Sequence, residues 1–307
     1  MIKRTLSQVV ILFIMLTAGF SNTFAQEQLY QSAPQRVIVL ELSLLDDLML
    51  LGIKPIAIAG NEVGEGALPS YMLNEIRSIP SVGSKQQPSL TKIAALKPDL
   101  IIADTTFHRS IQSQLEKIAP TVMLNGIMGN PQTQLENIKV LAKLFHKQKT
   151  AEKVIDQYEL TTAKDIKEGQ AHRATVLMGY VAESGVFRAL SANAIATEIL
   201  ASIGKENLIK AYSSRQRIEM TPEAVLAKNP QVIVILVTDN DYTTIRKLTS
   251  NPLWQQIPAV KANKVYYLSR DVWAQVHGLR ATEIALDEAR DVEFLNLGIP
   301  QKLNHYS

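Results

Sequence analysis

The sequence predicts an α/β protein made of two similar lobes, each a parallel sheet with helices on both faces. Short apolar runs without polar alternation are separated by helical patterns, which is typical of strands buried on both faces. An internal repeat in the sequence predicts that the protein has two such lobes. Residues 88–104 (PSLTKIAALKPDLIIAD) and 220–236 (MTPEAVLAKNPQVIVIL) both read as a turn, a short helix, a proline break and a buried strand.

The individual elements follow from composition and periodicity. Strands are expected at Val37–Leu40, Ile56–Ala59, Leu100–Ala103, Thr121–Leu124, Thr175–Met178, Val232–Val237 and Val265–Leu268. Helices are expected at Leu44–Leu51, Leu90–Leu96, Ile111–Ile118, Ala194–Ile203 and Pro222–Ala227.

A long helical stretch lies between the two halves of the repeat. Pro131–Phe145 and Thr150–Ile166 have helical patterns, and neither has Gly or Pro in its interior. At about 1.5 Å per residue the second helix is roughly 25 Å long. This favours a stiff connector between lobes over an ordinary surface helix of the first lobe. The expected division is an N-terminal lobe at 26–145, a connecting helix at 146–170 and a C-terminal lobe at 171–307.

Residues 1–25 have the features of a secretory signal peptide. Lys3 and Arg4 precede an apolar run, and Thr23-Phe24-Ala25 is close to an A-x-A cleavage site. The alternative is a retained anchor helix. The chain has no cysteine, which excludes lipid attachment at the signal junction, disulfides, thiol catalysis and Cys-ligated zinc. We therefore expect an exported protein of the bacterial periplasm, beginning near Gln26.

Charge and motif content exclude several classes of function. The formal net charge is +3, and no basic domain or tail is present, so nucleic acid is not an expected partner. The histidines are scattered, which argues against a resident metal or a bare zinc or manganese cargo. No G-x-S-x-G, H-E-x-x-H, P-loop or complete G-x-G-x-x-G motif occurs. An enzyme is therefore not expected, and an exported α/β hydrolase remains the alternative from another class.

Several motifs together resemble one family. They are PQRVIVLE (34–41), LGIKPIAIA (51–59), VGSKQQPSL (82–90), IAALKPDLIIAD (93–104), NPLW (251–254) and VWA (272–274). In this order and spacing the chain resembles the periplasmic iron–siderophore binding proteins of ABC transporters, nearest to those that bind ferric dicitrate. The resemblance covers the whole mature chain. It implies a class III binding protein, in which two Rossmann-like lobes joined by a single long helix hold the ligand in the cleft between them.

The resemblance also implies a cargo and partners. The ligand would be a ferric siderophore that brings its own chelator, without a further cofactor. The protein would be a monomer that closes only slightly and delivers the ligand to an inner-membrane ABC permease.

Ligands of open α/β sheets bind outside the carboxyl ends of the strands. This rule predicts ligand-binding residues at Glu41, Asn61, Thr105, His108, Arg109, Tyr180 and Trp273. Two loops add Arg188, Arg215 and Arg217, and Arg280 is a further arginine expected to make the cleft positive. Arginine suits bidentate recognition of carboxylates, so these residues favour an anionic ferric carboxylate-type siderophore or ferric dicitrate. Haem, a corrinoid or a hydroxamate siderophore are the alternative ligands.

Each candidate also has a structural interpretation. A loop arginine is often a solvated surface charge, and His108 is compatible with an ordinary loop residue. Tyr180 and Trp273 are candidates for flat apolar walls, but Trp273 equally suits a core position. Glu41 equally suits the first turn of a helix, where the dipole stabilises an acid.

A second site concerns the transporter. The resemblance implies that one glutamate on each lobe docks onto the permease. Glu223 occupies this position in the second half of the repeat, whereas the first half has Thr91 there. The chain departs from the family pattern at Thr91, which leaves the first docking contact in doubt.

Overall fold

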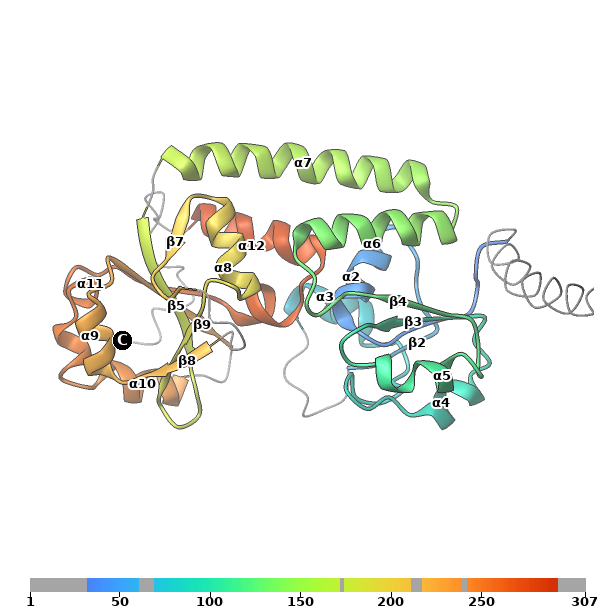
Figure 1. Cartoon of the computed structure of the whole chain (residues 1–307), viewed down its shortest axis with the longest axis horizontal. Helices are drawn as coiled ribbons and strands as arrows, with labels where there is room; N and C mark the ends of the chain where they lie inside the picture. Colours follow the sequence, from blue (N-terminus) through green and yellow to red (C-terminus); the bar gives the residue numbers. More distant parts are fainter. Residues whose placement is uncertain (1–31, 61–68, 172–173, 211–216, 239–241, 292–307) are drawn as a thin grey trace, which may run out of the picture.

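The computed structural model describes residues 32–60, 69–171, 174–210, 217–238 and 242–291. It contains two α/β lobes, and the long helix α7 (Gln148–Ala171) lies across both of them (Figure 1). The predicted signal peptide, Asn61 and Arg215 lie outside the described residues. Within the described part of the chain, no helix has the length and apolarity needed to cross a membrane.

The first lobe is built on a parallel sheet in the order β2-β1-β3-β4. Its strands are β1 (Val37–Val39), β2 (Ala57–Ile58), β3 (Leu100–Asp104) and β4 (Thr121–Leu124). Its helices are α2 (Leu42–Leu50), α3 (Ser70–Ile76), α4 (Leu90–Ala95), η1 (Arg109–Ile111), α5 (Gln112–Leu115) and α6 (Pro131–Leu144). Side chains alternate along each strand, so Val37 and Val39 pack with α2 and α6, whereas Ile38 and Leu40 pack with α4 and α5.

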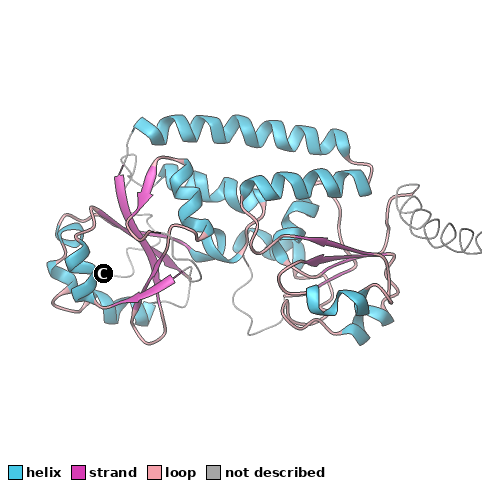
Figure 2. Cartoon of the chain, in the orientation of Figure 1, coloured by secondary structure: helices cyan, strands magenta, loops and turns pink. Residues whose placement is uncertain are grey.

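The second lobe has a larger sheet in the order β10-β9-β5-β6-β8, with β7 also paired to β5. Its strands are β5 (Ala174–Val181), β6 (Phe187–Leu190), β7 (Lys205–Asn207), β8 (Arg217–Met220), β9 (Val232–Val237) and β10 (Val265–Ser269). Its helical segments are α8 (Ile195–Ser202), α9 (Pro222–Lys228), α10 (Tyr242–Thr249), η2 (Trp254–Gln256), α11 (Pro258–Lys261) and the π-helical η3 (Asp271–Gln275). Figure 2 shows the helices on both sides of these strands.

The second sheet differs from the expectation of purely parallel pairing. Strand β6 is antiparallel to both β5 and β8. Neither β6 nor β8 is a continuous buried run, because Arg188 and Glu219 interrupt them with partly or fully exposed charges. Both strands therefore lack the continuous apolar pattern that predicts the other strands. The overall prediction of two α/β lobes is confirmed.

The internal repeat corresponds to a repeated local structure. Ser89 Oγ accepts a hydrogen bond from Lys92 N at 3.3 Å, and Thr221 Oγ1 accepts one from Ala224 N at 3.3 Å. Each side chain caps a short helix, α4 or α9, and a buried parallel strand follows, β3 or β9. Thr91 and Glu223 both occupy the second position of these helices, and both are exposed.

Two helices join the lobes. Helix α7 has 24 residues and is therefore about 36 Å long, longer than expected. Helix α12 (Leu279–Asp291) follows the second lobe but contacts α2, α6 and α7 as well as α8. Val276, Leu279 and Ala281 belong to the hydrophobic core of the first lobe. The end of the chain thus returns to the first lobe, and this places η3 and its neighbours between the lobes.

Candidate functional site

A small cavity lies on the side of the second lobe that faces the first. Its volume is about 120 Å³, and it is lined by Tyr180, Leu190, Ala194, Ile195, Ala196, Arg217, Arg270, Ala274, Gln275 and His277. His277 connects it to the first lobe, because its backbone N–H donates to Ser43 Oγ at 2.9 Å and its ring Nδ1 lies 2.6 Å from the Ile127 carbonyl oxygen. The cavity therefore lies where the strand-end rule predicts a ligand.

A larger hollow, of about 390 Å³, lies at the other end of β5. It is lined by Ala174, Thr175, Ala201, Gly204, Lys205, Glu206 and Gln231. The charged side chains that line this hollow, Lys205 and Glu206, are of opposite sign. We place the ligand in the smaller cavity, because its lining residue His277 is hydrogen-bonded to Ser43 and Ile127 of the first lobe.

Two arginines give the smaller cavity its charge. Arg217 begins β8, and Arg270 directly follows β10. No lining residue is acidic. Among the described residues, neither arginine forms an ion pair with Asp or Glu. Burial lowers the pKa of His277 to about 4, so its ring is neutral at neutral pH and leaves the positive charge to the arginines.

The other predicted arginines lie elsewhere. Arg188 donates from Nε and Nη2 to Glu219 Oε1, at 3.0 and 2.8 Å, across the paired strands β6 and β8. Arg109 is exposed in η1 on the far face of the first-lobe sheet from α2. Neither residue lines the cavity, so neither adds an unpaired charge to it.

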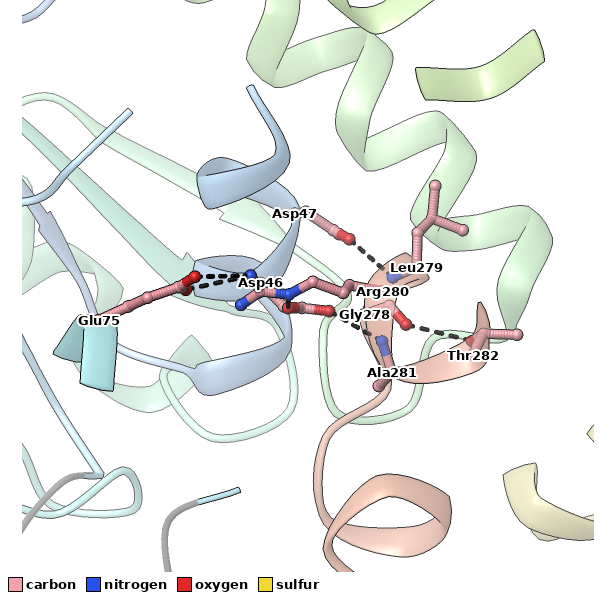
Figure 3. Close-up of polar contacts among 8 residues, drawn as sticks. All are labelled: Asp46, Asp47, Glu75, Gly278, Leu279, Arg280, Ala281 and Thr282. Atoms are coloured by element: carbon pink, nitrogen blue, oxygen red, sulfur yellow. Dashed lines mark hydrogen bonds and ion pairs between the residues drawn. The ribbon is translucent and has the colours of Figure 1, made fainter. Parts of the chain in front are cut away.

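Arg280 was predicted to line the cleft, but from α12 it forms ion pairs with carboxylates of α2 and α3 instead (Figure 3). Its Nε donates to Asp46 Oδ1 at 2.8 Å, and its Nη1 donates to Glu75 Oε2 at 3.0 Å. The guanidinium also lies over the Tyr71 ring, 5.0 Å from its centroid. Its charge is therefore compensated by buried and half-exposed carboxylates of the first lobe.

Asp46 and the adjacent Asp47 also cap α12. Asp46 Oδ2 accepts from Ala281 N and Asp47 Oδ1 accepts from Leu279 N, each at 3.2 Å (Figure 3). Both aspartates lie in α2 and are fully buried. Burial raises the pKa of both carboxyl groups, most strongly for Asp47, and Arg280 opposes the rise at Asp46. Side chains of one helix thus supply the N-cap of another, which fixes the segment that follows the cavity wall.

Trp273 is the second correction to the predicted site. Its side chain is 0% exposed and packs in the second-lobe core, so it does not form a wall of the cleft. Its indole Nε1 donates to Glu288 Oε2 at 2.8 Å. The turn of π-helix in η3 directs this ring inward, whereas the next residues, Ala274 and Gln275, line the cavity.

His108 and Thr105 belong to the frame of the first lobe. Asp104 N donates to His108 Nδ1 at 2.9 Å, so the ring proton is on Nε2, which donates to the Lys85 carbonyl oxygen at 2.8 Å. Burial lowers the pKa of His108, which keeps the ring neutral. Thr105 is half-buried and its N–H donates to the Leu124 carbonyl oxygen at 2.8 Å. His108 therefore holds the loop of Lys85 and is too buried to reach a ligand in the cleft.

Glu41 caps α2 from beneath the cleft. Its Oε2 accepts from Ser43 N at 2.8 Å and from Leu44 N at 3.2 Å, and the side chain is buried. Burial raises its pKa to about 7, Asp104 adds to the rise, and Lys85 opposes it. The helix-cap interpretation of Glu41 fits these contacts.

This pKa gives a prediction on stability. The folded pKa of about 7 exceeds the ordinary 4.5, so the folded state binds the proton more tightly and stability is lost as the pH rises from about 4.5 to 7. Ionisation of Glu41 at high pH should lower the free energy of unfolding by about 3 kcal/mol, and Glu41→Gln should abolish this decrease because glutamine does not ionise. In urea unfolding, the variant should match the wild type at pH 4.5 and be more stable at pH 8. An equal difference at both pH values would contradict the assignment.

Three polar residues that line the cavity are not among the predicted ligand-binding residues: Arg270, Gln275 and His277. Lys85 lies close enough to Glu41 and His277 to influence both pKa values, which places it at the first-lobe side. The strand-end rule does point to residues 269–273, which include Arg270 directly after β10. Among the described residues, no three His, Asp or Glu side chains gather where they would suit a metal ion.

Two lobes with a charged cavity between them define an α/β substrate-binding protein of the two-lobed class. A family model described as "Periplasmic binding protein" matches residues 37–272. The chain therefore belongs to this family of periplasmic binding proteins.

Individual proteins agree with this assignment. The chain is 32% identical over 266 residues to a putative ABC transporter substrate-binding lipoprotein, YhfQ, of Bacillus subtilis strain 168, which covers 83% of this chain and 82% of the relative. It is 31% identical over 266 residues to the Fe(3+)-citrate-binding protein YfmC of the same strain, with 84% and 80% covered. The structure of petrobactin-binding protein YclQ from Bacillus subtilis shares the fold, with a TM-score of 0.74 at 21% identity, covering 86% of this chain and 93% of that one.

Proposed function

We propose that the chain is a non-enzymatic periplasmic protein that captures an anionic ferric carboxylate-type chelate, such as ferric dicitrate, and delivers it to an inner-membrane ABC importer. One observation carries the choice of ligand: Arg217 and Arg270 line an acid-free cavity between the lobes and have no carboxylate partner among the described residues. Their guanidinium groups suit ligand carboxylates. The identity to a protein named for Fe(3+)-citrate binding supports the same choice.

The arginines also indicate how the iron is held. A guanidinium donates hydrogen bonds and does not coordinate a metal at neutral pH. In this proposal the chelator alone coordinates the iron, and the protein recognises the carboxylate oxygens on the outside of the complex without a cofactor of its own. The positive cavity accelerates the encounter with an anion. The mature protein, free of residues 1–25, acts as a monomer.

Titration of the mature protein with a panel of ligands tests this function. The panel contains ferric dicitrate, a ferric carboxylate siderophore, a ferric hydroxamate siderophore, haem, cobalamin and iron-free citrate, with binding followed by tryptophan fluorescence and calorimetry. Saturable binding of a ferric carboxylate chelate, with Kd about micromolar or tighter, is expected. Binding of haem, cobalamin or the hydroxamate siderophore alone would show that the ligand is not a ferric carboxylate chelate. Turnover in a hydrolase assay would show that the protein is an enzyme. Absence of binding to every ligand of the panel would overturn the proposed function.

Glu223 is proposed as the second-lobe contact to the permease. Its side chain is exposed in the first turn of α9, and Thr221 lowers its pKa by hydrogen bonding, so it is ionised. Glu223→Lys is expected to reduce uptake of the chelate by whole cells several-fold, because a docking charge would be reversed. Chelate affinity of the purified variant should not change. The matched control is Glu219→Lys, whose carboxylate is already paired with Arg188.

A further inference from the structure

Tyr180 is the most buried of the polar side chains that surround the cavity arginines. It lies near the carboxyl end of β5 and is 6% exposed, although its ring belongs to the cavity lining. The Arg270 guanidinium lies over the ring, 4.1 Å from its centroid. The arginine therefore covers a face of the ring, and this face is not available as an apolar wall for a ligand.

The stacked arginine comes from a distant strand of the same sheet. Strand β9 lies between β10, which precedes Arg270, and β5, which carries Tyr180. With a spacing of about 4.8 Å between neighbouring strands, the two backbones are about 10 Å apart. Arg270 must extend across the end of β9 to reach the ring. A long side chain in this arrangement would have many rotamers in the absence of a partner.

Tyr180 also has neighbours on the two strands that flank β5. Register pairs Tyr180 with Arg188 on β6 and with Leu236 on β9. Arg188 is in turn fixed by Glu219, and its pKa is raised first by Glu219 and then by Tyr180. Tyr180 is therefore a neighbour of two arginines, Arg188 and Arg270, whose surroundings differ. Arg188 is compensated by a carboxylate, whereas among the described residues Arg270 has the aromatic face but no acidic partner.

We propose that Tyr180 is a positioning residue, which holds the Arg270 guanidinium flat on its ring so that the N–H edge faces the cavity. A planar guanidinium stacked on an aromatic face keeps its donors free in its own plane. Arg270 is then preorganised to bind a carboxylate of the chelate edge-on, and less conformational freedom is lost on binding. This role rests on the proposed function, since it concerns the same ligand and the same site.

Two substitutions of Tyr180 separate the ring face from the hydroxyl group. Tyr180→Phe keeps the ring and should bind ferric dicitrate within about twofold of the wild type, whereas Tyr180→Leu removes the ring and should weaken binding about tenfold. In the Arg270→Ala background, Tyr180→Leu should have almost no further effect, because its target is gone. Thermal unfolding of each variant checks that the second lobe is intact.

The double-mutant cycle decides between positioning and other roles. A full tenfold loss from Tyr180→Leu in the Arg270→Ala background would overturn the proposal, and so would a loss in Tyr180→Phe as large as that in Tyr180→Leu. A measurement without ligand separates this inference from the proposed function. Ring-current shifts of the Arg270 side-chain protons should be present in the wild type and Tyr180→Phe and absent in Tyr180→Leu. Their absence in the wild type would overturn the stacking even if chelates bind.

Discussion

Combined Arg217→Ala and Arg270→Ala substitution is expected to lower the affinity for a ferric carboxylate chelate at least about 100-fold. Each arginine offers charge-assisted hydrogen bonds to the ligand, and such bonds contribute about 1.5–3 kcal/mol each. The effect is large because no acidic residue lines the cavity and the two charges are uncompensated among the described residues. Calorimetric titration with ferric dicitrate measures the loss.

A matched double substitution controls for net charge. Arg109→Ala with Arg246→Ala removes two positive charges outside the cavity, from exposed positions in η1 and α10. Its affinity should remain within a few-fold of the wild type, and the small change should disappear as salt is added. An equal loss in both double variants would show that overall charge, and not the cavity, attracts the ligand.

Replacement of Asp46 by alanine is expected to destabilise the protein by about 3–5 kcal/mol. The buried carboxylate holds both Arg280 and the Ala281 N–H, so its removal leaves a half-buried cation and a helix terminus without their acceptor. Gly278 also packs directly on it, since a Cβ at this position would lie 2.3 Å from Asp46 Oδ2. Urea unfolding of the ligand-free protein measures the effect.

Glu75→Ala is the control for this prediction. Glu75 contacts the same arginine, but its side chain is 44% exposed. An exposed ion pair contributes about 1 kcal/mol or less, so this variant should stay close to the wild type. If Asp46→Ala unfolded at the same urea concentration as Glu75→Ala, the contact between α2 and α12 would not stabilise the junction of the lobes.

The sequence indicated the architecture because its signals are local. Apolar runs of strand length, the repeated helix-Pro-strand pattern and a long stretch without Gly or Pro are each contained within a short window. Strands β6 and β8 escaped because they are short and carry charges, and their pairing depends on a distant partner. Helix α12 escaped as a link between lobes for the same reason, since its contacts to α2 join opposite ends of the chain.

The candidate site was harder to predict, since an arginine's role depends on whether an acid lies beside it. Arg188 pairs with Glu219, 31 residues away, and Arg280 pairs with Asp46, 234 residues away. No sequence pattern marks such pairs, so the predicted arginines looked alike. The rule of strand ends indicated the region that contains Tyr180 and Arg270, which line the cavity proposed as the ligand site. The rule does not show which side chains of η3 point into the core and which point into the cavity. Trp273 was therefore predicted at the cavity, where Ala274 and Gln275 lie instead.

Iron itself provides the most direct test of the central claim, that a ferric chelate binds between the lobes. Crystals of the mature protein grown with ferric dicitrate, or with the tightest binder of the panel, would be measured at the iron absorption edge. We predict one anomalous peak in the cleft, beside the cavity that Arg217, Arg270 and His277 line. A peak confined to the outer surface, or to the hollow beside Lys205, would contradict the account, and so would crystals that hold no iron at saturating chelate.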